Sequence, residues 1–166
     1  MFIRDQVLRT GVILAGFVCY AATAEIHAAA SVPISGTVTY TDTITANPDN
    51  TSCPLTGMSI GTGTVSHLGR AAFVSTDCLT FDGLNYTIHN GTFTLTAANG
   101  DTITGTFTGT FSPSGRGAVY VMQGGDLTIT GGSGRFKNAS GGGPLQASED
   151  LITHQGTTTL AGRISY

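Results

Sequence analysis

Apolar and threonine residues alternate along the segment Gly91–Phe111, on both sides of the dipeptide Asn99-Gly100. The apolar positions, all of one parity, are Phe93, Leu95, Ala97, Ile103, Phe107 and Phe111. A period of two predicts half-buried strands. Asn-Gly supplies the two positive-φ residues that a two-residue type I′ turn requires. The segment therefore predicts a β-hairpin that turns at Asn99-Gly100.

The same alternation predicts strands along most of the chain. Besides the two strands of the hairpin, the expected strands are Ser31–Ala46, Met58–His67, Arg70–Asp77, Leu79–His89, Ala118–Met122 with its continuation Leu127–Thr130 after an interruption at Gly124-Gly125, Leu145–His154 and Thr157–Tyr166. Turn-forming residues between them predict a loop at Asn47–Pro54, a turn at Asn90-Gly91 and a loop at Ser112–Gly117. Gly131–Gly143 has too many glycines for a helix and too few apolar residues for a strand.

Eight or nine short strands joined by tight turns, each with one apolar and one threonine face, predict a closed antiparallel barrel or a sandwich. We favour the barrel, because closure removes the exposed sheet edges that a chain with few lysines leaves unprotected. No apolar period of 3.6 residues persists for three turns, so no substantial helix is expected after the leader. The expected fold is an all-β barrel of about eight strands, forming a single domain over residues 31–166.

Residues 1–30 have the pattern of a signal peptide. Arg4 and Arg9 precede an uninterrupted apolar run at Gly11–Ala22. Small-residue cleavage patterns follow at residues 22–24 and 28–30, and the second is preferred because the strand pattern begins just after it. A transmembrane anchor is the alternative, but the run is shorter than the ~20 residues that span a bilayer. A secreted or periplasmic protein is expected.

Export leaves Cys53 and Cys78 as the cysteines of the mature chain, because Cys19 lies in the leader. Two cysteines in an oxidising compartment predict one disulfide. Two free thiols are the alternative, and a metal site needs more ligands than two. The low charge content, 10% of residues with a net charge of −3, excludes the basic face that a nucleic-acid-binding protein needs.

The glycine-rich stretch Gly131–Gly141, GGSGRFKNASG, resembles the signature of the allene oxide cyclase and dirigent-like barrels, which are calycin-like in architecture. It also resembles uncharacterised secreted bacterial barrel proteins. The resemblance implies an eight-stranded barrel with a central cavity. It further implies that Gly131, Gly132 and Gly134 are turn residues, and that Phe136 and Ala139 plug the barrel beside a short helical turn. The cyclase's pocket residues have no counterpart here, so the resemblance transfers no activity.

No catalytic or cofactor-binding motif is present, so neither catalytic residues nor a cofactor are predicted. His67, His89 and His154 are too scattered for a metal site and are interpreted as solvated or supporting residues. Glu149 and Asp150 are neighbours on a strand, point to opposite faces, and are interpreted as solvent-exposed. Asp42 and His67 differ from these residues, because the alternation places each on an apolar face near a strand end. Either could line the mouth of a cavity or mark where a strand leaves the core.

These observations favour a non-enzymatic exported barrel whose lumen accepts a small apolar ligand, with Asp42 and His67 near its mouth. Eight strands leave a lumen that side chains can just fill or that holds one small ligand. The alternatives are a structural protein of the cell envelope or surface, a small outer-membrane barrel, and a lipid-converting enzyme related to the cyclases. Only the outer-membrane alternative involves a membrane, and the oligomeric state is not predicted. An enzyme would need a perturbed titratable group deep in the lumen.

Overall fold

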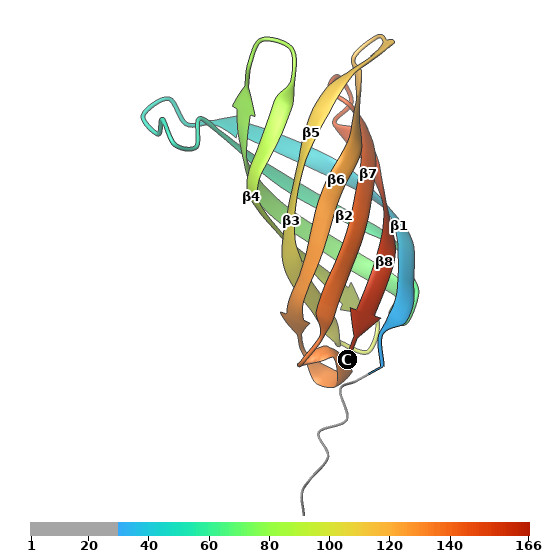
Figure 1. Cartoon of the computed structure of the whole chain (residues 1–166). Helices are drawn as coiled ribbons and strands as arrows, with labels where there is room; N and C mark the ends of the chain where they lie inside the picture. Colours follow the sequence, from blue (N-terminus) through green and yellow to red (C-terminus); the bar gives the residue numbers. More distant parts are fainter. Residues whose placement is uncertain (1–29) are drawn as a thin grey trace, which may run out of the picture.

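The computed structural model describes residues 30–166, and within that range the chain forms a closed antiparallel barrel of eight strands (Figure 1). The strands are β1 (Val32–Ala46), β2 (Leu55–Val65), β3 (Gly69–Phe81), β4 (Tyr86–Ala97), β5 (Thr102–Arg116), β6 (Val119–Gly132), β7 (Ser140–Asp150) and β8 (Gln155–Ser165). Each strand pairs with its neighbours in sequence, and β8 pairs with β1. The predicted barrel is confirmed. The predicted signal peptide lies outside the described residues, apart from Ala30.

The alternation of side chains sets the two faces of the sheet. In β1, Val38 and Tyr40 are buried in the barrel interior, whereas Thr39 and Thr41 are exposed. Threonines of neighbouring strands meet on the outer surface, where the hydroxyls of Thr76 and Thr92 lie 3.0 Å apart. The apolar face therefore lines the inside of the barrel, because burying it there removes apolar surface from water.

The predicted hairpin at Asn99-Gly100 is confirmed, but its turn type is wrong. β4 ends at Ala97 and β5 begins at Thr102, and of the two turn residues only Gly100 has a positive φ, at 87°. The amide of Gly100 donates to the carbonyl of Ala97 at 3.0 Å, and the amide of Ala97 donates to the carbonyl of Asp101 at 2.9 Å. These hydrogen bonds are those of a longer hairpin loop that needs one left-handed residue, and the glycine of Asn99-Gly100 supplies it.

The predicted strand Leu79–His89 and the predicted turn at Asn90-Gly91 are wrong. β3 continues to Phe81, and the chain turns at residues 82–85 instead. There the Asp82 carboxylate accepts hydrogen bonds from the amides of the third and fourth turn residues, Leu84 and Asn85. Asn90-Gly91 lies inside β4, where the register shifts between Ile88 and Gly91 and Asn90 has a φ of 53°. A β-bulge moves the inward positions from one parity to the other without a turn.

The glycine-rich and proline-containing segments also contain more strand than predicted. Residues 112–116 belong to β5, so the predicted loop at Ser112–Gly117 shortens to a tight turn after Arg116. Both ends of Gly131–Gly143 pair as well, because β6 ends at Gly132 and β7 begins at Ser140. A Cβ at Gly141 or Gly142 would overlap the backbone of a neighbouring strand. Glycine there permits close approach of strands, which composition alone does not reveal.

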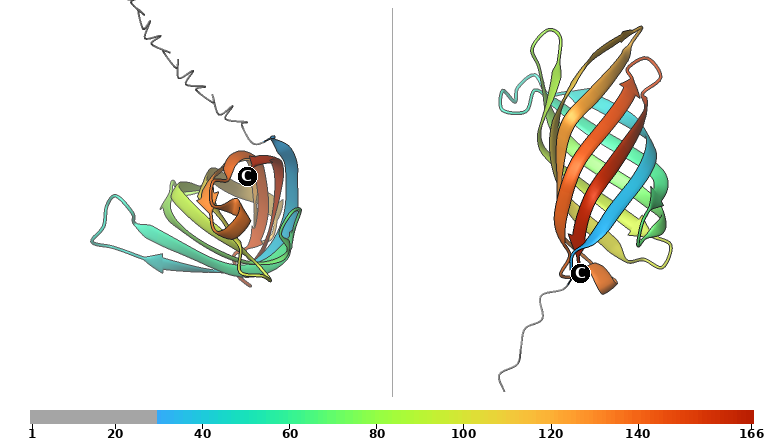
Figure 2. Two further views of the ribbon diagram at one scale, coloured as in Figure 1. Left: turned by 90° about the horizontal axis from the view of Figure 1, so that it is seen from below. Right: turned by 45° about the vertical axis from the view of Figure 1, so that its right-hand side comes forward.

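A one-turn helix, η1 (Gly134–Phe136), lies across the lower end of the barrel, where the C-terminus also lies (Figure 2). Phe136 is fully buried, Ala139 is 3% exposed, and the Phe136 ring lies 4.8 Å from that of Tyr166. Gly134 has a φ of 58° and faces Asp101, whose carboxylate pairs with Arg135 at 3.5 Å. These contacts close the lower end of the barrel with apolar side chains.

The upper end of the barrel carries the loops at residues 47–54, 82–85, 117–118 and 151–154, which extend away from the strands in Figure 1. The predicted disulfide is confirmed: Cys53 in the first of these loops is bonded to Cys78 in β3, with Cα atoms 5.3 Å apart. Within residues 30–166, no helix has the length and apolar character needed to cross a membrane.

Candidate functional site

The barrel encloses a cavity of about 80 Å³ in the upper half of its lumen. Most of its lining is apolar, and six of the lining side chains are aromatic: Tyr40, Phe73, Tyr86, Phe93, Phe107 and Phe111. The polar lining residues are Tyr40, Asp42, Ser59, Ser75, Asp77, Tyr86, Glu149 and Thr158. A single water needs only about 10–15 Å³ of such space, so the cavity can hold several waters or a slender ligand.

Strand register stacks the polar residues in layers near the upper end. Asp42 pairs with Ser59, which pairs with Ser75, and Tyr40 occupies the next inward position below Asp42 on β1. Inward glycines provide the space for the larger side chains. A Cβ at Gly156 would overlap the Tyr40 ring, and a Cβ at Gly57 would overlap the Asp77 carboxylate. Two inward glycines therefore make room for polar side chains of the lumen.

Asp42 lines the cavity and is 8% exposed. The hydroxyl of Ser59 donates a hydrogen bond to Asp42 Oδ1 at 2.7 Å. Burial raises the pKa of the Asp42 carboxyl, and the Ser59 hydrogen bond offsets part of that effect. Its backbone amide also donates to the carbonyl of His154 at 2.9 Å, which ties β1 to the loop after β7.

Glu149 and Tyr40 form a hydrogen-bonded pair on either side of Gly156, which is the register partner of both. Each is 7% exposed, and the Tyr40 hydroxyl donates to Glu149 Oε2 at 3.2 Å. The other carboxylate oxygen, Oε1, is buried without a hydrogen-bond partner among the described residues. Burial raises the pKa of Glu149 to about 7, and the charges of Asp42 and Asp77 add to this effect. Burial and Glu149 also raise the pKa of Tyr40.

Asp77 lies on β3 at a bulge, where the register with β4 shifts between Thr76 and Cys78. Its side chain lines the cavity, and its Oδ1 atom is buried without a hydrogen-bond partner among residues 30–166. Burial raises its pKa to about 6, and the charge of Asp42 adds to this effect. Two buried carboxylate oxygens, one on each side of the lumen, thus lack the partners that buried polar atoms normally have.

His67 lies at the opposite end of the barrel from Asp42. It sits in the turn between β2 and β3 with a φ of 68°, and its Nε2 atom is 2.8 Å from the carbonyl oxygen of Pro33. Its Nδ1 atom is 3.2 Å from the Tyr166 hydroxyl, and the Arg135 guanidinium donates to its carbonyl. The structure therefore does not bring His67 and Asp42 together, and His67 does not line the cavity.

The other two candidate histidines are surface residues. His89 is exposed beside Thr80, with His89 Nε2 and Thr80 Oγ1 3.0 Å apart, and His154 is exposed in the loop after β7. In the part of the chain that the structure describes, no three His, Cys, Asp or Glu side chains are placed to hold a metal ion. The lumen carboxylates are therefore not grouped as a metal site.

The interpretation of Glu149 as a solvent-exposed group is wrong, whereas its neighbour Asp150 does face outward. Asp150 Oδ1 accepts hydrogen bonds from the amides of Ile152 and Thr153 and so stabilises the turn after β7. Sequence reasoning also missed Asp77 as a site residue. A usable signal existed, because Asp77 shares parity with the buried residues Ser75 and Leu79.

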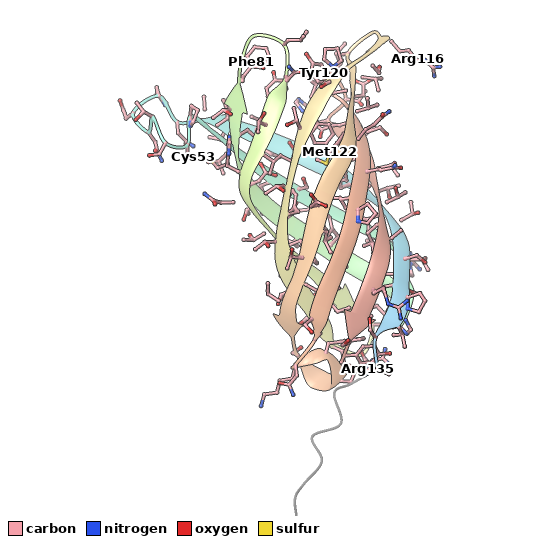
Figure 3. All side chains as sticks on the ribbon, viewed as in Figure 1. Cys53, Phe81, Arg116, Tyr120, Met122 and Arg135 are labelled. Atoms are coloured by element: carbon pink, nitrogen blue, oxygen red, sulfur yellow. A yellow bond between two sulfur atoms is a disulfide. The ribbon has the colours of Figure 1, made fainter. Side chains whose placement is uncertain are left out.

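An aromatic cluster stands at the upper end of the lumen. Tyr86 stacks on Phe81, with ring centroids 4.5 Å apart, and meets the edge of Tyr120 at 5.5 Å. Figure 3 shows Phe81 and Tyr120 near the upper rim of the barrel. Tyr86 lines the cavity, so this cluster borders the approach to the buried carboxylates.

No protein-family model matches the chain, and no curated protein matches it in sequence. The geometry of the lumen is therefore the basis for any functional assignment.

Proposed function

We propose that the protein is an exported, secreted or periplasmic barrel that binds a small, slender and largely apolar ligand in its lumen. The observation that carries this proposal is the cavity of about 80 Å³, whose lining is mostly aliphatic and aromatic side chains with a few polar groups at one end. Ligand sites typically combine apolar walls with a few polar groups that orient the ligand. The closed lower end and the loops at the upper end favour entry from above.

The disulfide is consistent with residence in an oxidising compartment. The outer surface weighs against the outer-membrane alternative, because its outward positions are mostly threonine, whereas a barrel in a bilayer presents an apolar band to lipid. The exposed apolar side chains Met58, Ile60 and Val74 on β2 and β3 are too few to form such a band. A purely structural role would require a packed lumen, and the cavity argues against it.

Binding of a neutral environment-sensitive dye, such as phenylnaphthylamine, and its displacement by octanol test this proposal. Ala147 lines the cavity, and the neighbouring residue Ser148 is exposed on the outside of the same strand. We expect Ala147→Phe to fill the lumen and abolish dye binding, and Ser148→Phe, its matched control, to bind normally. The proposal fails if the unmodified protein binds neither probe, or if both variants bind the dye equally.

One observation favours a second candidate, an enzyme that transfers a proton on an apolar substrate. Glu149 is a buried carboxyl with a pKa near neutrality, hydrogen-bonded to Tyr40 inside a cavity. A general acid or base works best when its pKa lies near the working pH. Mass spectrometry of ligands recovered after incubation with the protein distinguishes the two candidates. A binding protein returns its ligand unchanged, and an enzyme returns a product that Glu149→Gln does not form.

A further inference from the structure

The lumen holds three carboxyl side chains that come from strands far apart in sequence. Asp42 lies on β1, Asp77 on β3 and Glu149 on β7, so Asp77 and Glu149 come from opposite sides of the closed barrel, and Asp42 comes from the strand midway between them. All three side chains line the same cavity. Each of the other two carboxylates raises the pKa of Glu149, which indicates that the three charges lie close enough to interact.

Hydrogen bonding within the protein satisfies this cluster only in part. Asp42 accepts from Ser59, and Glu149 Oε2 accepts from Tyr40. Glu149 Oε1 and Asp77 Oδ1 accept no hydrogen bond from any described residue, and Glu149 is only 7% exposed, so water reaches it little. A buried oxygen without a partner costs about 1–3 kcal/mol, more if it is charged. The Glu149 and Asp77 side chains both line the cavity, and a ligand there would displace no protein hydrogen bond from these two oxygens.

The cluster also lacks a neutralising cation. Within residues 30–166, no Lys, Arg or His side chain lines the cavity. His154 does not line the cavity but is exposed in the loop that meets Asp42, where its charge lowers the pKa of the Asp42 carboxyl. The titratable groups that face the cluster are Tyr40 on β1, Tyr86 on β4 and the three carboxyls themselves. Every ionisable side chain that lines this space is therefore neutral or negative, and none carries a positive charge that would attract an anionic ligand.

The approach to the cluster suits a cation. Tyr86 and Phe111 line the cavity, and Tyr86 packs with Phe81 and Tyr120 at the rim. The faces of aromatic rings attract ammonium groups. Farther down, Phe93, Phe107 and Leu127 offer only apolar surface to a ligand.

We propose that the lumen selects a ligand with a primary ammonium group on a slender apolar body. This inference rests on the proposed function and names its substrate class. The ammonium group donates hydrogen bonds to Glu149 Oε1 and Asp77 Oδ1, and the apolar body lies against the aromatic and aliphatic lining below. A primary ammonium fits because it carries three donors and one positive charge, whereas the site offers free acceptors and negative charge.

A matched series with one alkyl chain tests the head group: octylamine, octanol, octanoate and octyltrimethylammonium, each competing with the neutral dye at about pH 8. Hydrogen bonds to charged groups contribute enough for an affinity difference of about tenfold or more. We expect octylamine to bind at least about tenfold more tightly than octanol, and octanoate more weakly than octanol. The trimethylated compound keeps the charge but has no donors, so it should bind more weakly than octylamine.

Variants of the carboxyl groups locate the preference. Glu149→Gln and Asp77→Asn should each reduce the preference for octylamine over octanol by about tenfold while octanol still binds, which also shows that the variants fold. Asp126→Asn, which removes an exposed carboxylate on β6, should leave the preference unchanged. Octylamine should bind less tightly at about pH 5 than at about pH 8, because the carboxyls become protonated, and octanol should show no such loss.

The outcomes separate this inference from the proposed function. If octanol and the dye bind but octylamine binds no more tightly, the ammonium proposal is overturned and the lumen remains a neutral binding site. Equal affinity for octylamine and octyltrimethylammonium would overturn the proposal that the ligand's ammonium group donates hydrogen bonds to the carboxylates. If neither the dye nor any compound of the series binds, the proposed function fails as well.

Discussion

At the scale of single residues, Glu149 is held in an environment that a carboxyl side chain disfavours. Its carboxyl group is 7% exposed, one of its oxygens has no hydrogen-bond partner within residues 30–166, and it lies in a largely apolar lumen with two other acidic groups. Such a group costs stability whenever it is ionised. Natural proteins retain costly buried polar groups mainly at sites of binding or catalysis, which is why Glu149 is central to both functional proposals.

Glu149→Gln should make the protein more stable at alkaline pH. The folded-state pKa of about 7 lies above the ordinary value of 4.5, so the unfolded chain binds fewer protons between these values. Stability contributed by the neutral acid is therefore complete below about pH 4.5 and is lost as the pH rises through about 7. A shift of this size corresponds to at most about 3 kcal/mol.

Urea denaturation at about pH 8 and about pH 5 measures this effect. We expect Glu149→Gln to raise the free energy of unfolding by about 1–3 kcal/mol at the higher pH and by much less at the lower. Asp126→Asn is the exposed control and should change neither value appreciably. An equal effect of Glu149→Gln on the free energy of unfolding at both pH values would contradict ionisation of the buried carboxyl as the cause.

At the scale of elements, bulges decide which residues of a strand face the lumen. In β4 the inward residues are even-numbered up to Ile88 and odd-numbered from Gly91, and the shift occurs at Asn90 with its φ of 53°. β6 changes parity in the same way between Met122 and Gly125, where Gly124 has a φ of 83°. Each bulge lets apolar residues of both parities point inward within one strand.

Asn90→Val should destabilise the protein by about 1–2 kcal/mol, because a β-branched residue in the left-handed region clashes with its own backbone. Asn90→Gly should be nearly neutral, since glycine adopts this conformation without a clash. Thr92→Val is the matched control, an exposed residue in regular conformation on the same strand, expected within about 0.5 kcal/mol of the unmodified protein. Chemical denaturation gives all three values, and equal losses for the two valine variants would rule out strain at the bulge.

At the scale of the whole molecule, the two ends of the barrel differ in construction. The lower end is closed by Phe136, Tyr166 and the helical turn η1. The upper end carries the polar cluster, the aromatic rim and the loops, of which one is tied down by Cys53–Cys78. That disulfide joins the loop before β2 to β3 immediately beside Asp77, so it also restrains one carboxylate of the candidate site.

Loss of the disulfide should lower the free energy of unfolding by about 3 kcal/mol, the chain-entropy value for its separation of 25 residues. Denaturation with and without reductant measures this loss. The Cys53→Ser, Cys78→Ser double variant should match the reduced protein and be insensitive to reductant. An intact mass two hydrogens heavier than the oxidised form under non-reducing conditions would show that the bond is absent.

The sequence by itself determined the class of fold, the hairpin at Asn99-Gly100 and the cysteine pair, because these depend on local alternation, turn chemistry and cysteine count. It also placed Asp42 on an inward face. The sequence did not predict strand boundaries and turn type correctly. A bulge such as that at Asn90 changes the parity of the apolar positions just as a turn does, and glycine-rich strand segments have the composition of a loop.

Only the tertiary structure decided which side chains meet. Tyr40 and Glu149 are 109 residues apart in sequence and hydrogen-bond only because β8 closes the barrel against β1. Asp42 and His67 have similar local sequence patterns but lie at opposite ends of the barrel. The end at which a residue lies depends on strand direction and register around the whole barrel, which a local pattern does not contain. The buried carboxylate cluster is likewise a property of closure, because each of three strands contributes one inward carboxyl and the sheet brings the three around one cavity.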